Sequence, residues 1–384
     1  MLRAASTIHL VRTFCALVLA ATACKLALAQ SLLSIPLPLP EQVAMPLRTA
    51  NIPADALGAI VMRVDDGAII ISHGARRSLQ PASTLKLLTT LAGMEKLGPT
   101  FRGRTEMRTT GPIAAGILQG DLILRGLADA DLDWEALQRM LQTLRNQGIA
   151  EIRGDLVLDR HFFSPARPDK DAPPFDETPE FRYNVIPDAL LLNTNLLQFD
   201  LASADQGMHI GMSPALERVS IVSDMKLVER ACTQWEDGWK LPTQSKAADG
   251  AIRIELHGEF PKNCSVSTNI NILDRVDFAD RLFRSLWRNL GGTFRGSTRE
   301  GATPADARLL AEHRSRTLAE VTRDINKRSD NPMARLLYLS LGALAANDSG
   351  ASDVATPQRA EREVRAWLQQ RGIAQDGLVL ERYP

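Results

Sequence analysis

The sequence predicts an α+β protein in which helix-rich segments flank a large, mainly-β insert. Two patterns predict this class: apolar residues at helical spacing before residue 100 and again after residue 275, and short strand-like runs between them. The composition agrees, since 45% hydrophobic and 23% charged residues are typical of a globular chain rather than a disordered or fibrous one. A length of 384 residues corresponds to about two or three domains.

The N-terminal segment predicts a secretory signal peptide. Arg3 and Arg12 give it a basic start, and the apolar run over 14–23 is too short to span a bilayer. Ala27-Leu28-Ala29 has the small-residue pattern of a cleavage site, so we expect cleavage after it and export of the chain. Two alternatives stay open, a lipoprotein lipidated at Cys24 and an uncleaved membrane anchor.

A β-hairpin is predicted after an extended lead-in. Residues 31–50 hold four prolines, which favour extended backbone. The strand-like runs 57–64 and 68–72 flank Asp65-Asp66-Gly67, whose residues favour a tight turn.

The next segment, residues 83–97, predicts a helix that ends at Gly98. Apolar side chains recur there at the spacing of one helical face. We expect the buried face of this helix to carry Leu87, Leu91, Met94 and Leu97.

Strands dominate the middle of the chain. A single helix is predicted there over 134–145, and the proline-rich stretch 164–179 predicts a loop. The strand-like runs are 121–124, 154–158, 219–222 and 252–256.

Helical patterns return in the last quarter of the chain. The predicted helices cover 278–290, 318–327, 333–344 and 360–370. We therefore divide the chain into a signal peptide (1–29), a discontinuous domain (30–100 and 275–384) and an inserted mainly-β region (101–274).

Charge and cysteine content limit the chemistry. Lys plus Arg and Asp plus Glu number 45 each, which argues against a nucleic-acid-binding protein. The six histidines are scattered and no C-x-x-C or H-E-x-x-H pattern occurs, so we assign no metal. After removal of the signal peptide, Cys232 and Cys264 remain. In an oxidising compartment we expect them to form a disulfide, the alternative being two separate buried thiols.

Ser83-Thr84-Leu85-Lys86 is the first pattern that predicts chemistry. Residues three apart on a helix share a face, so the lysine amine can reach the serine hydroxyl. A serine nucleophile needs such a base, and a lysine serves when burial or a nearby cation keeps it partly neutral. The alternative is that Ser83 only caps the helix. A second copy, Ser223 to Lys226, lies in strand-like sequence, and we discount it.

Ser329-Asp330-Asn331 is the second pattern, and it lies between two predicted helices. Pro332 fits the first helical position, which makes Asn331 the expected N-cap of the later helix. The functional interpretation instead brings Ser329 and Asn331 into a cleft beside the nucleophile, where Ser329 relays a proton and Asn331 holds the substrate amide. A second copy of this pattern occurs at Ser267-Thr268-Asn269.

The two patterns occur together in serine β-lactamases and penicillin-binding proteins. The chain resembles the D-alanyl-D-alanine carboxypeptidase/endopeptidase family, the class C low-molecular-mass penicillin-binding proteins, over most of its mature length. A large insert between the two motifs is typical of that family and not of β-lactamases. Further segments that carry the resemblance are 81–87, 97–99, 120–126, 154–159, 183–184, 187–190 and 325–331.

The resemblance implies a penicillin-binding-protein/β-lactamase-like serine transpeptidase domain that works without cofactor or metal. It implies that Ser83 is the acylated nucleophile and Lys86 its base. Ser329 and Asn331 would complete the second motif.

The resemblance also implies what the chain acts on. The substrates would be peptidoglycan stem peptides and cross-links in the periplasm, with β-lactams as covalent inhibitors and no nucleic acid as partner. Insert residues near the cleft recognise the donor side chain in the family, and Asp176 and Tyr183 are our candidates. Peripheral membrane association stays open.

A third motif of the family, K-T-G, does not occur in this sequence. In the family its strand borders the active site and supplies part of the oxyanion hole, and losing one oxyanion donor costs roughly 10²–10³ in rate. We therefore expect a truncated product with impaired activity. Two other functions compete with a serine peptidase: a non-catalytic peptidoglycan-binding or scaffold protein on the same fold, and a β-lactamase, against which the insert argues.

Overall fold

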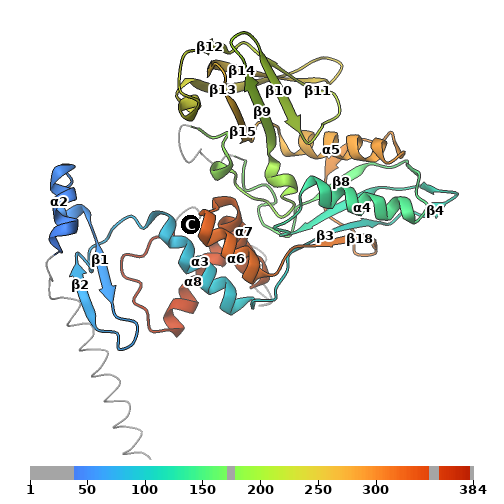
Figure 1. Cartoon of the computed structure of the whole chain (residues 1–384). Coiled ribbons are helices and arrows are strands. Elements are labelled where there is room, and N and C mark those ends of the chain that lie inside the picture. The colour runs from blue at the N-terminus through green and yellow to red at the C-terminus, as the bar shows by residue number, and fades with distance from the viewer. Residues whose placement is uncertain (1–38, 171–177, 346–353, 381–384) are drawn as a thin grey trace, which may run out of the picture. The chain divides into compact units, whose positions relative to one another are not determined.

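The computed structural model describes residues 39–170, 178–345 and 354–380, and these form two compact units (Figure 1). The first unit holds the described residues up to Pro81, and the second begins at Ala82. The predicted signal peptide and the candidate Asp176 lie outside the described residues. Within the described ranges, no helix combines the length and the apolar character needed to cross a membrane.

The predicted hairpin forms the sheet of the first unit. β1 (Ala59–Met62) pairs antiparallel with β2 (Ile69–His73). The prediction of an extended lead-in over residues 31–50 is wrong for part of that range, because Glu41–Thr49 forms helix α2. Three of the four prolines precede this helix, and its acidic first turn and basic last turn suit the helix dipole.

A group of helices at the predicted positions comes from the first and the last parts of the second unit's sequence. In Figure 1, α3, α6 and α7 lie side by side, in agreement with their contacts. The apolar core of this group includes Ala92, Tyr338, Val364 and Trp367. The helices are α3 (Leu85–Lys96), α6 (Leu318–Arg328), α7 (Asn331–Leu344) and α8 (Thr356–Gln370).

The buried face of α3 differs from the expected one. Leu87 and Leu91 are 53% and 54% exposed. The buried side chains are instead Lys86, Thr89, Thr90, Ala92 and Gly93. Apolar spacing failed here because α3 packs through small and polar residues, which allow a close approach of α7.

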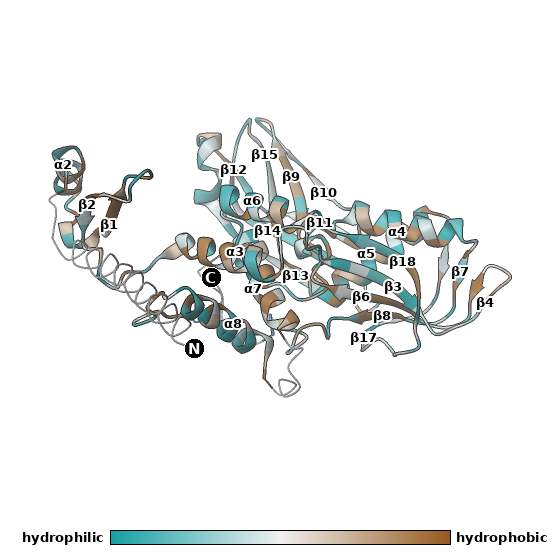
Figure 2. Cartoon of the chain, turned by 90° about the horizontal axis from the view of Figure 1, so that it is seen from below, coloured by the Kyte–Doolittle hydropathy of each residue, from teal (hydrophilic) through white to brown (hydrophobic). Residues whose placement is uncertain are grey.

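The inserted region contains two sheets that share strands from distant parts of the sequence. The larger has the order β17-β8-β6-β3-β18, and β6, β8 and β17 run parallel to one another. The strands of this larger sheet are β3 (Arg104–Thr109), β6 (Leu122–Leu127), β8 (Leu156–Asp159), β17 (Thr298–Glu300) and β18 (Arg308–Arg314). Figure 2 shows that helix α4 (Trp134–Asn146) carries both hydrophilic and hydrophobic residues, as a helix packed on one face should. The smaller has the order β16-β7-β5-β4, with β4 (Ile113–Ala114), β5 (Ile117–Leu118), β7 (Glu151–Ile152) and β16 (Thr293–Phe294); the helices are α4 (Trp134–Asn146) and α5 (Arg275–Asn289).

Two further sheets complete the insert. One has the order β10-β9-β15, and in the other β14 pairs with β11, β12 and β13. A disulfide joins Cys232 to Cys264, with 5.2 Å between their Cα atoms. The strands are β9 (Leu197–Ser203), β10 (Met208–Ser213), β11 (Val219–Ser223), β12 (Lys226–Val228), β13 (Trp239–Lys246), β14 (Ile252–Pro261) and β15 (Ser265–Ile270).

The insert extends further along the chain than the predicted boundary at 274. Helix α5 packs into the same apolar core as α4, and β17 and β18 pair with β8 and β3. By packing, the insert therefore runs to Arg314. Pattern reading placed the boundary where helical spacing resumed, but strand pairing is decided by partners more than 100 residues away in the sequence. The described residues up to Pro81 form a unit separate from α3, although we expected 30–100 to belong together.

A buried carboxylate, that of Asp188, joins segments of the second unit. Asp188 is 0% exposed, and its Oδ2 accepts hydrogen bonds from Arg160 Nε at 2.9 Å and Arg275 Nη1 at 2.6 Å. The network continues through Arg167, which pairs with Asp169 at 2.8 Å. Asp188 lies in the Pro187-Asp188-Ala189-Leu190 segment, one of those that carry the family resemblance.

We predict that Asp188→Ala strongly destabilises the second unit. The substitution leaves two arginines without their shared buried counter-charge, which costs ~3–5 kcal/mol when a buried pair is broken. Denaturant unfolding followed by circular dichroism measures this change. The control is Asp249→Ala, which breaks the exposed pair with Arg218 and should leave the free energy of unfolding nearly unchanged. Equal effects from both substitutions would contradict the assignment.

Candidate active site

The predicted nucleophile and base lie at the start of α3. Ala82–Thr84 forms a 3-10 turn that leads into the helix, which places Lys86 in the first turn of α3. Lys86 Nζ donates a hydrogen bond to Ser83 Oγ at 2.8 Å, as the i, i+3 spacing predicts. Ala82, just before Ser83, has a positive φ of 45°, an uncommon conformation for alanine that aims the turn.

The second motif reaches the same amine from a distant part of the chain. Lys86 Nζ lies 3.3 Å from Ser329 Oγ, although 243 positions separate the two residues. Lys86 is buried, at 4% exposed, whereas Ser83 and Ser329 are both exposed, so the amine is covered while the two serines stay accessible. The structure therefore brings Ser83, Lys86 and Ser329 together in one hydrogen-bonded group.

The environment of Lys86 lowers the pKa of its amine. Burial lowers the pKa of the amine, because the charged ammonium loses its hydration. The positive charge of Arg335 lowers this pKa further, while the carboxylate of Asp330 raises it. A lysine with a lowered pKa is suited to take a proton from a neighbouring hydroxyl.

Packing between helices brings the two motifs together. A Cβ on Gly93 of α3 would meet the side chain of Leu337 of α7 at 2.9 Å, so a larger residue there would require Leu337 to shift. One turn earlier, Thr90 exchanges a hydrogen bond with Asn326 of α6, with 3.3 Å between Asn326 Nδ2 and Thr90 Oγ1. These contacts hold α3 against the turn between α6 and α7.

The Ser329-Asp330-Asn331 turn is capped differently from our expectation. Asp330, and not Asn331, is the N-cap of α7, and its Oδ1 accepts a hydrogen bond from the Met333 amide at 3.0 Å. A carboxylate caps a helix start as well as an amide does, and it also suits the positive end of the helix. Ser329 ends α6 in the left-handed region, with φ 56° and ψ 40°. This conformation turns the chain sharply between the two helices and presents the Ser329 hydroxyl to Lys86.

Because Asp330 caps α7, the Asn331 side chain does not serve as the cap, and it contacts the insert instead. Its Nδ2 donates to the carbonyl oxygen of Tyr183 at 3.1 Å. Two neighbouring contacts join the same parts: Arg182 pairs with Asp330 at 2.8 Å, and Arg335 Nη1 donates to the Val185 carbonyl at 3.1 Å. The turn Arg182–Asn184 is thus attached to the second motif.

Tyr183, one of the two predicted recognition residues, borders the site. Its side chain is 40% exposed, and its hydroxyl shares a hydrogen bond with Thr178 Oγ1 at 2.6 Å. Sequence reasoning missed Arg335 and the capping role of Asp330. The signal for Arg335 was its position four residues after Asn331, which places it on the same helical face.

The discounted motif copies lie away from helix starts. Ser223 ends β11 and Lys226 begins β12, while Ser267-Thr268-Asn269 lies within β15. In the described part of the chain, no group of three or more His, Cys, Asp or Glu side chains is arranged to hold a metal ion.

The chain matches the sequence profile of the D-Ala-D-Ala carboxypeptidase 3 (S13) family over residues 39–382. This match covers both motifs and the whole insert. The chain belongs to the D-Ala-D-Ala carboxypeptidase 3 (S13) family.

Curated relatives carry the same enzyme name. The chain is 28% identical over 297 residues to a D-alanyl-D-alanine carboxypeptidase of Actinomadura sp. (strain R39), a match to 74% of this chain and 54% of the relative. It is 25% identical over 293 residues to the D-alanyl-D-alanine carboxypeptidase DacB of Haemophilus influenzae. This match covers 73% of this chain and 58% of the relative. The chain thus spans somewhat more than half the length of the curated relatives it matches.

Solved structures show the same fold. Penicillin binding protein 4 from Haemophilus influenzae superposes with a TM-score of 0.66 at 23% identity, covering 83% of this chain and 68% of that one. The structure of that protein complexed with a novel β-lactam gives a TM-score of 0.61 at 22% identity. This superposition covers 85% of this chain and 70% of that one. The α+β fold of this S13 chain is therefore that of a penicillin-binding protein, as the sequence predicted.

We predict that Arg335→Met raises the pKa of the Lys86 amine. The substitution removes a cation that disfavours the charged amine, so Lys86 should lose its proton at higher pH than in the unchanged chain. An NMR titration of the lysine side-chain carbons, with the Lys86 signal assigned by Lys86→Arg, measures the shift. The control Arg323→Met removes an exposed charge from α6 and should leave the Lys86 titration in place. An unchanged titration in Arg335→Met would contradict the electrostatic role.

Proposed function

We propose that this S13 chain is a serine-type D-Ala-D-Ala carboxypeptidase that forms an acyl-enzyme on Ser83. The observation that carries the proposal is the hydrogen-bonded group in which the buried Lys86 Nζ lies 2.8 Å from Ser83 Oγ and 3.3 Å from Ser329 Oγ. Family membership and the names of the curated relatives support the substrate class.

The proposed reaction begins at the start of α3. Neutral Lys86 accepts the proton of the Ser83 hydroxyl as Oγ attacks the carbonyl carbon between the two D-alanines. The developing negative charge lies near the N-terminus of α3, where the helix dipole is favourable. Collapse of the tetrahedral species breaks the peptide bond and releases D-alanine.

Ser329 is suited to carry the proton to the leaving group. Its hydroxyl contacts Lys86, so a proton taken from Ser83 can pass through Ser329 to the departing amine. Water then attacks the Ser83 ester, and the hydroxyl regains its proton as the shortened peptide leaves. Cleavage of a cross-link between two stem peptides is the same reaction with a larger leaving amine, so we propose endopeptidase activity as well.

We further propose export and an action on peptidoglycan in the periplasm. The basic, apolar and small-residue pattern of residues 1–29 supports export, and the Cys232–Cys264 disulfide suits an oxidising compartment. Covalent reaction with β-lactams is expected from the same nucleophile, and a relative of this fold has been solved with a β-lactam.

We predict that the purified chain forms a stable adduct with a fluorescent penicillin and that Ser83→Ala abolishes it. Intact-protein mass spectrometry measures the adduct. The matched control is Ser223→Ala, the serine of the second S-x-x-K copy, which should acylate normally because it lies in a strand. A folded protein that gives no adduct would favour the non-catalytic peptidoglycan-binding interpretation, and rapid turnover of nitrocefin would favour a β-lactamase.

We predict that Ser329→Gly slows D-alanine release by roughly 10²-fold or more, as expected for a lost proton relay. Glycine accepts the positive φ of 56° without strain, so this substitution removes the hydroxyl and keeps the turn. D-alanine release from a D-Ala-D-Ala-terminated peptide measures the rate, and thermal unfolding checks the fold. Unchanged release with an intact fold would exclude Ser329 from the proton path.

A further inference from the structure

Four aromatic side chains of the insert form a continuous strip of neighbouring rings. Tyr183 stacks on Phe181 with 6.4 Å between ring centroids, and Phe181 lies 6.3 Å from Trp239. Trp239 then meets Trp235 edge to face at 5.5 Å. These spacings are those of interacting aromatic pairs. We call these four residues the aromatic strip.

Backbone, side-chain and disulfide contacts hold the aromatic strip in place. Phe181 forms a backbone bridge to Ile270 at the end of β15. Trp239 Nε1 donates to the buried carboxylate of Glu180 at 3.1 Å. The turn that carries Trp235 begins at Cys232, which the disulfide ties to Cys264. Phe181, Trp235 and Trp239 pack against the apolar core and remain partly exposed to solvent. Their rings therefore form a preorganised surface.

One end of the strip lies at the second motif. The carbonyl oxygen of Tyr183 accepts the hydrogen bond from Asn331, and the neighbouring Arg182 pairs with Asp330. Tyr183 is the most exposed ring of the four, at 40%. The strip therefore leads away from the candidate active site across the insert, toward Trp235.

A cavity of about 540 Å³, lined by polar and apolar side chains alike, shares the turn that carries Phe181 and Tyr183. Pro179 and Asn184, on either side of these two rings in the sequence, both line it. Amide side chains of Asn195, Asn271 and Gln244 line it from other elements. Asn195 Nδ2 donates to Asn271 Oδ1 at 2.7 Å and to the Leu273 carbonyl at 2.8 Å. Its volume is within the range of ligand-binding sites.

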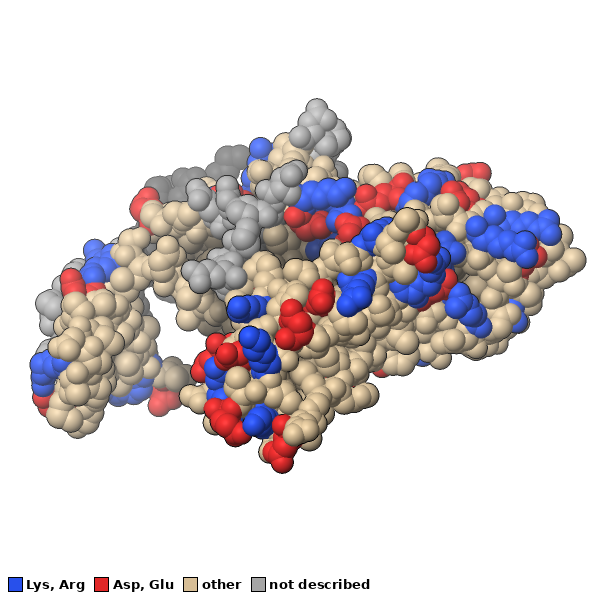
Figure 3. Space-filling view, turned by 90° about the horizontal axis from the view of Figure 1, so that it is seen from above, with Lys and Arg blue, Asp and Glu red and all other residues tan. Residues whose placement is uncertain are grey.

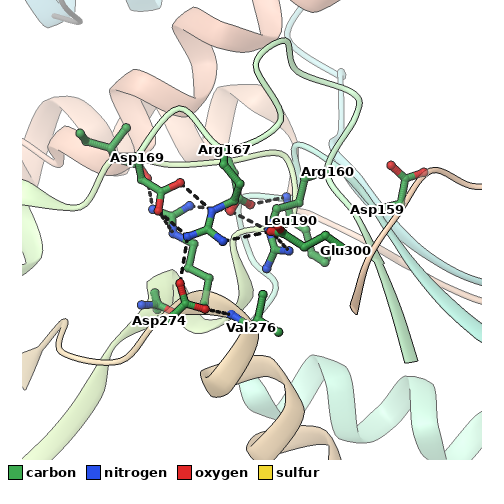
Figure 4. A network of polar contacts seen from close by, with 12 residues as sticks. Asp159, Arg160, Arg167, Asp169, Leu190, Asp274, Val276 and Glu300 are labelled. Atoms are coloured by element: carbon green, nitrogen blue, oxygen red, sulfur yellow. Dashed lines mark hydrogen bonds and ion pairs between the residues drawn. The ribbon is translucent and has the colours of Figure 1, made fainter. Parts of the chain in front are cut away.

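The charges around this cavity neutralise one another. Arg167 pairs with Asp169 at 2.8 Å and with Asp274 at 3.2 Å. Arg275 pairs with Asp169 at 3.3 Å and with the buried Asp188 at 2.6 Å. Among the charged side chains that line the cavity, every one thus has an opposite partner, as Figure 4 shows for Arg167. Such a lining favours an uncharged polar ligand over a charged peptide.

We propose that the aromatic strip and the adjoining cavity bind an uncharged carbohydrate chain of N-acetylated hexosamines. The apolar face of a pyranose ring packs on an aromatic face, and acetamido and hydroxyl groups match amide side chains that both donate and accept hydrogen bonds. The choice of this sugar rests on the proposed function, because such a chain is the backbone to which the stem peptides of peptidoglycan are attached. The strip would hold the glycan while a stem peptide reaches Ser83.

The test measures binding of the uncharged trisaccharide tri-N-acetylchitotriose to the full chain by isothermal titration calorimetry. The Ser83→Ala variant should bind it as the unchanged chain does, since the strip does not need the nucleophile. Trp235→Ala should bind about tenfold more weakly, as expected when an interface tryptophan is removed. Trp134→Ala, a partly exposed tryptophan on α4 outside the strip, is the matched control and should bind normally.

A second variant guards against misfolding of Trp235→Ala. Gln244→Ala changes an exposed side chain of the cavity wall and should also weaken binding, by severalfold. Absence of trisaccharide binding to the unchanged chain, or equal losses in Trp235→Ala and Trp134→Ala, would overturn the proposal. So would binding of a sugar-free D-Ala-D-Ala pentapeptide that depends on Trp235 in place of the trisaccharide. A chain that binds the trisaccharide but forms no penicillin adduct would refute the proposed function and leave this inference intact.

Discussion

The burial of Lys86 is the constraint on which the site depends. A lysine amine is rarely enclosed, because removing its charge from water is costly unless the amine is hydrogen-bonded or neutral. Here two serine hydroxyls supply the hydrogen bonds, at 2.8 and 3.3 Å. The cation of Arg335 reinforces the effect of burial on the pKa of the amine. The arrangement that makes Lys86 costly to bury thus lowers the pKa of its amine, as the proposed role of a base requires.

Helix packing makes this burial possible. Gly93 lets α3 and α7 approach closely, and the left-handed Ser329 turns the chain between α6 and α7 toward the amine. Asp330 then caps α7, which leaves Asn331 free to contact the insert. A change at Gly93 or Asp330 would therefore act on the site without touching a substrate.

The insert is attached to the site by charge and by backbone contacts. Asp188 joins Arg160 and Arg275 in the interior, and Arg182 pairs with Asp330 at the second motif. On the face shown in Figure 3, basic and acidic side chains lie next to one another, in keeping with the equal numbers in the composition. Opposite charges that pair locally join segments without creating a strong field of one sign.

The sequence by itself determined the local elements, since those depend on neighbouring residues. Spacing placed the hairpin, α3 to α8 and the Ser83–Lys86 contact, and the motif order indicated the family. Tertiary structure decided what depends on distant partners. Leu87 and Leu91 satisfy helical spacing yet lie exposed, because α7 approaches the opposite face of α3. β17 and β18 extend the insert past residue 274, because their partners lie far back in the sequence. The meeting of Lys86 with Ser329 likewise exists only after packing, since no local rule relates residues 243 positions apart.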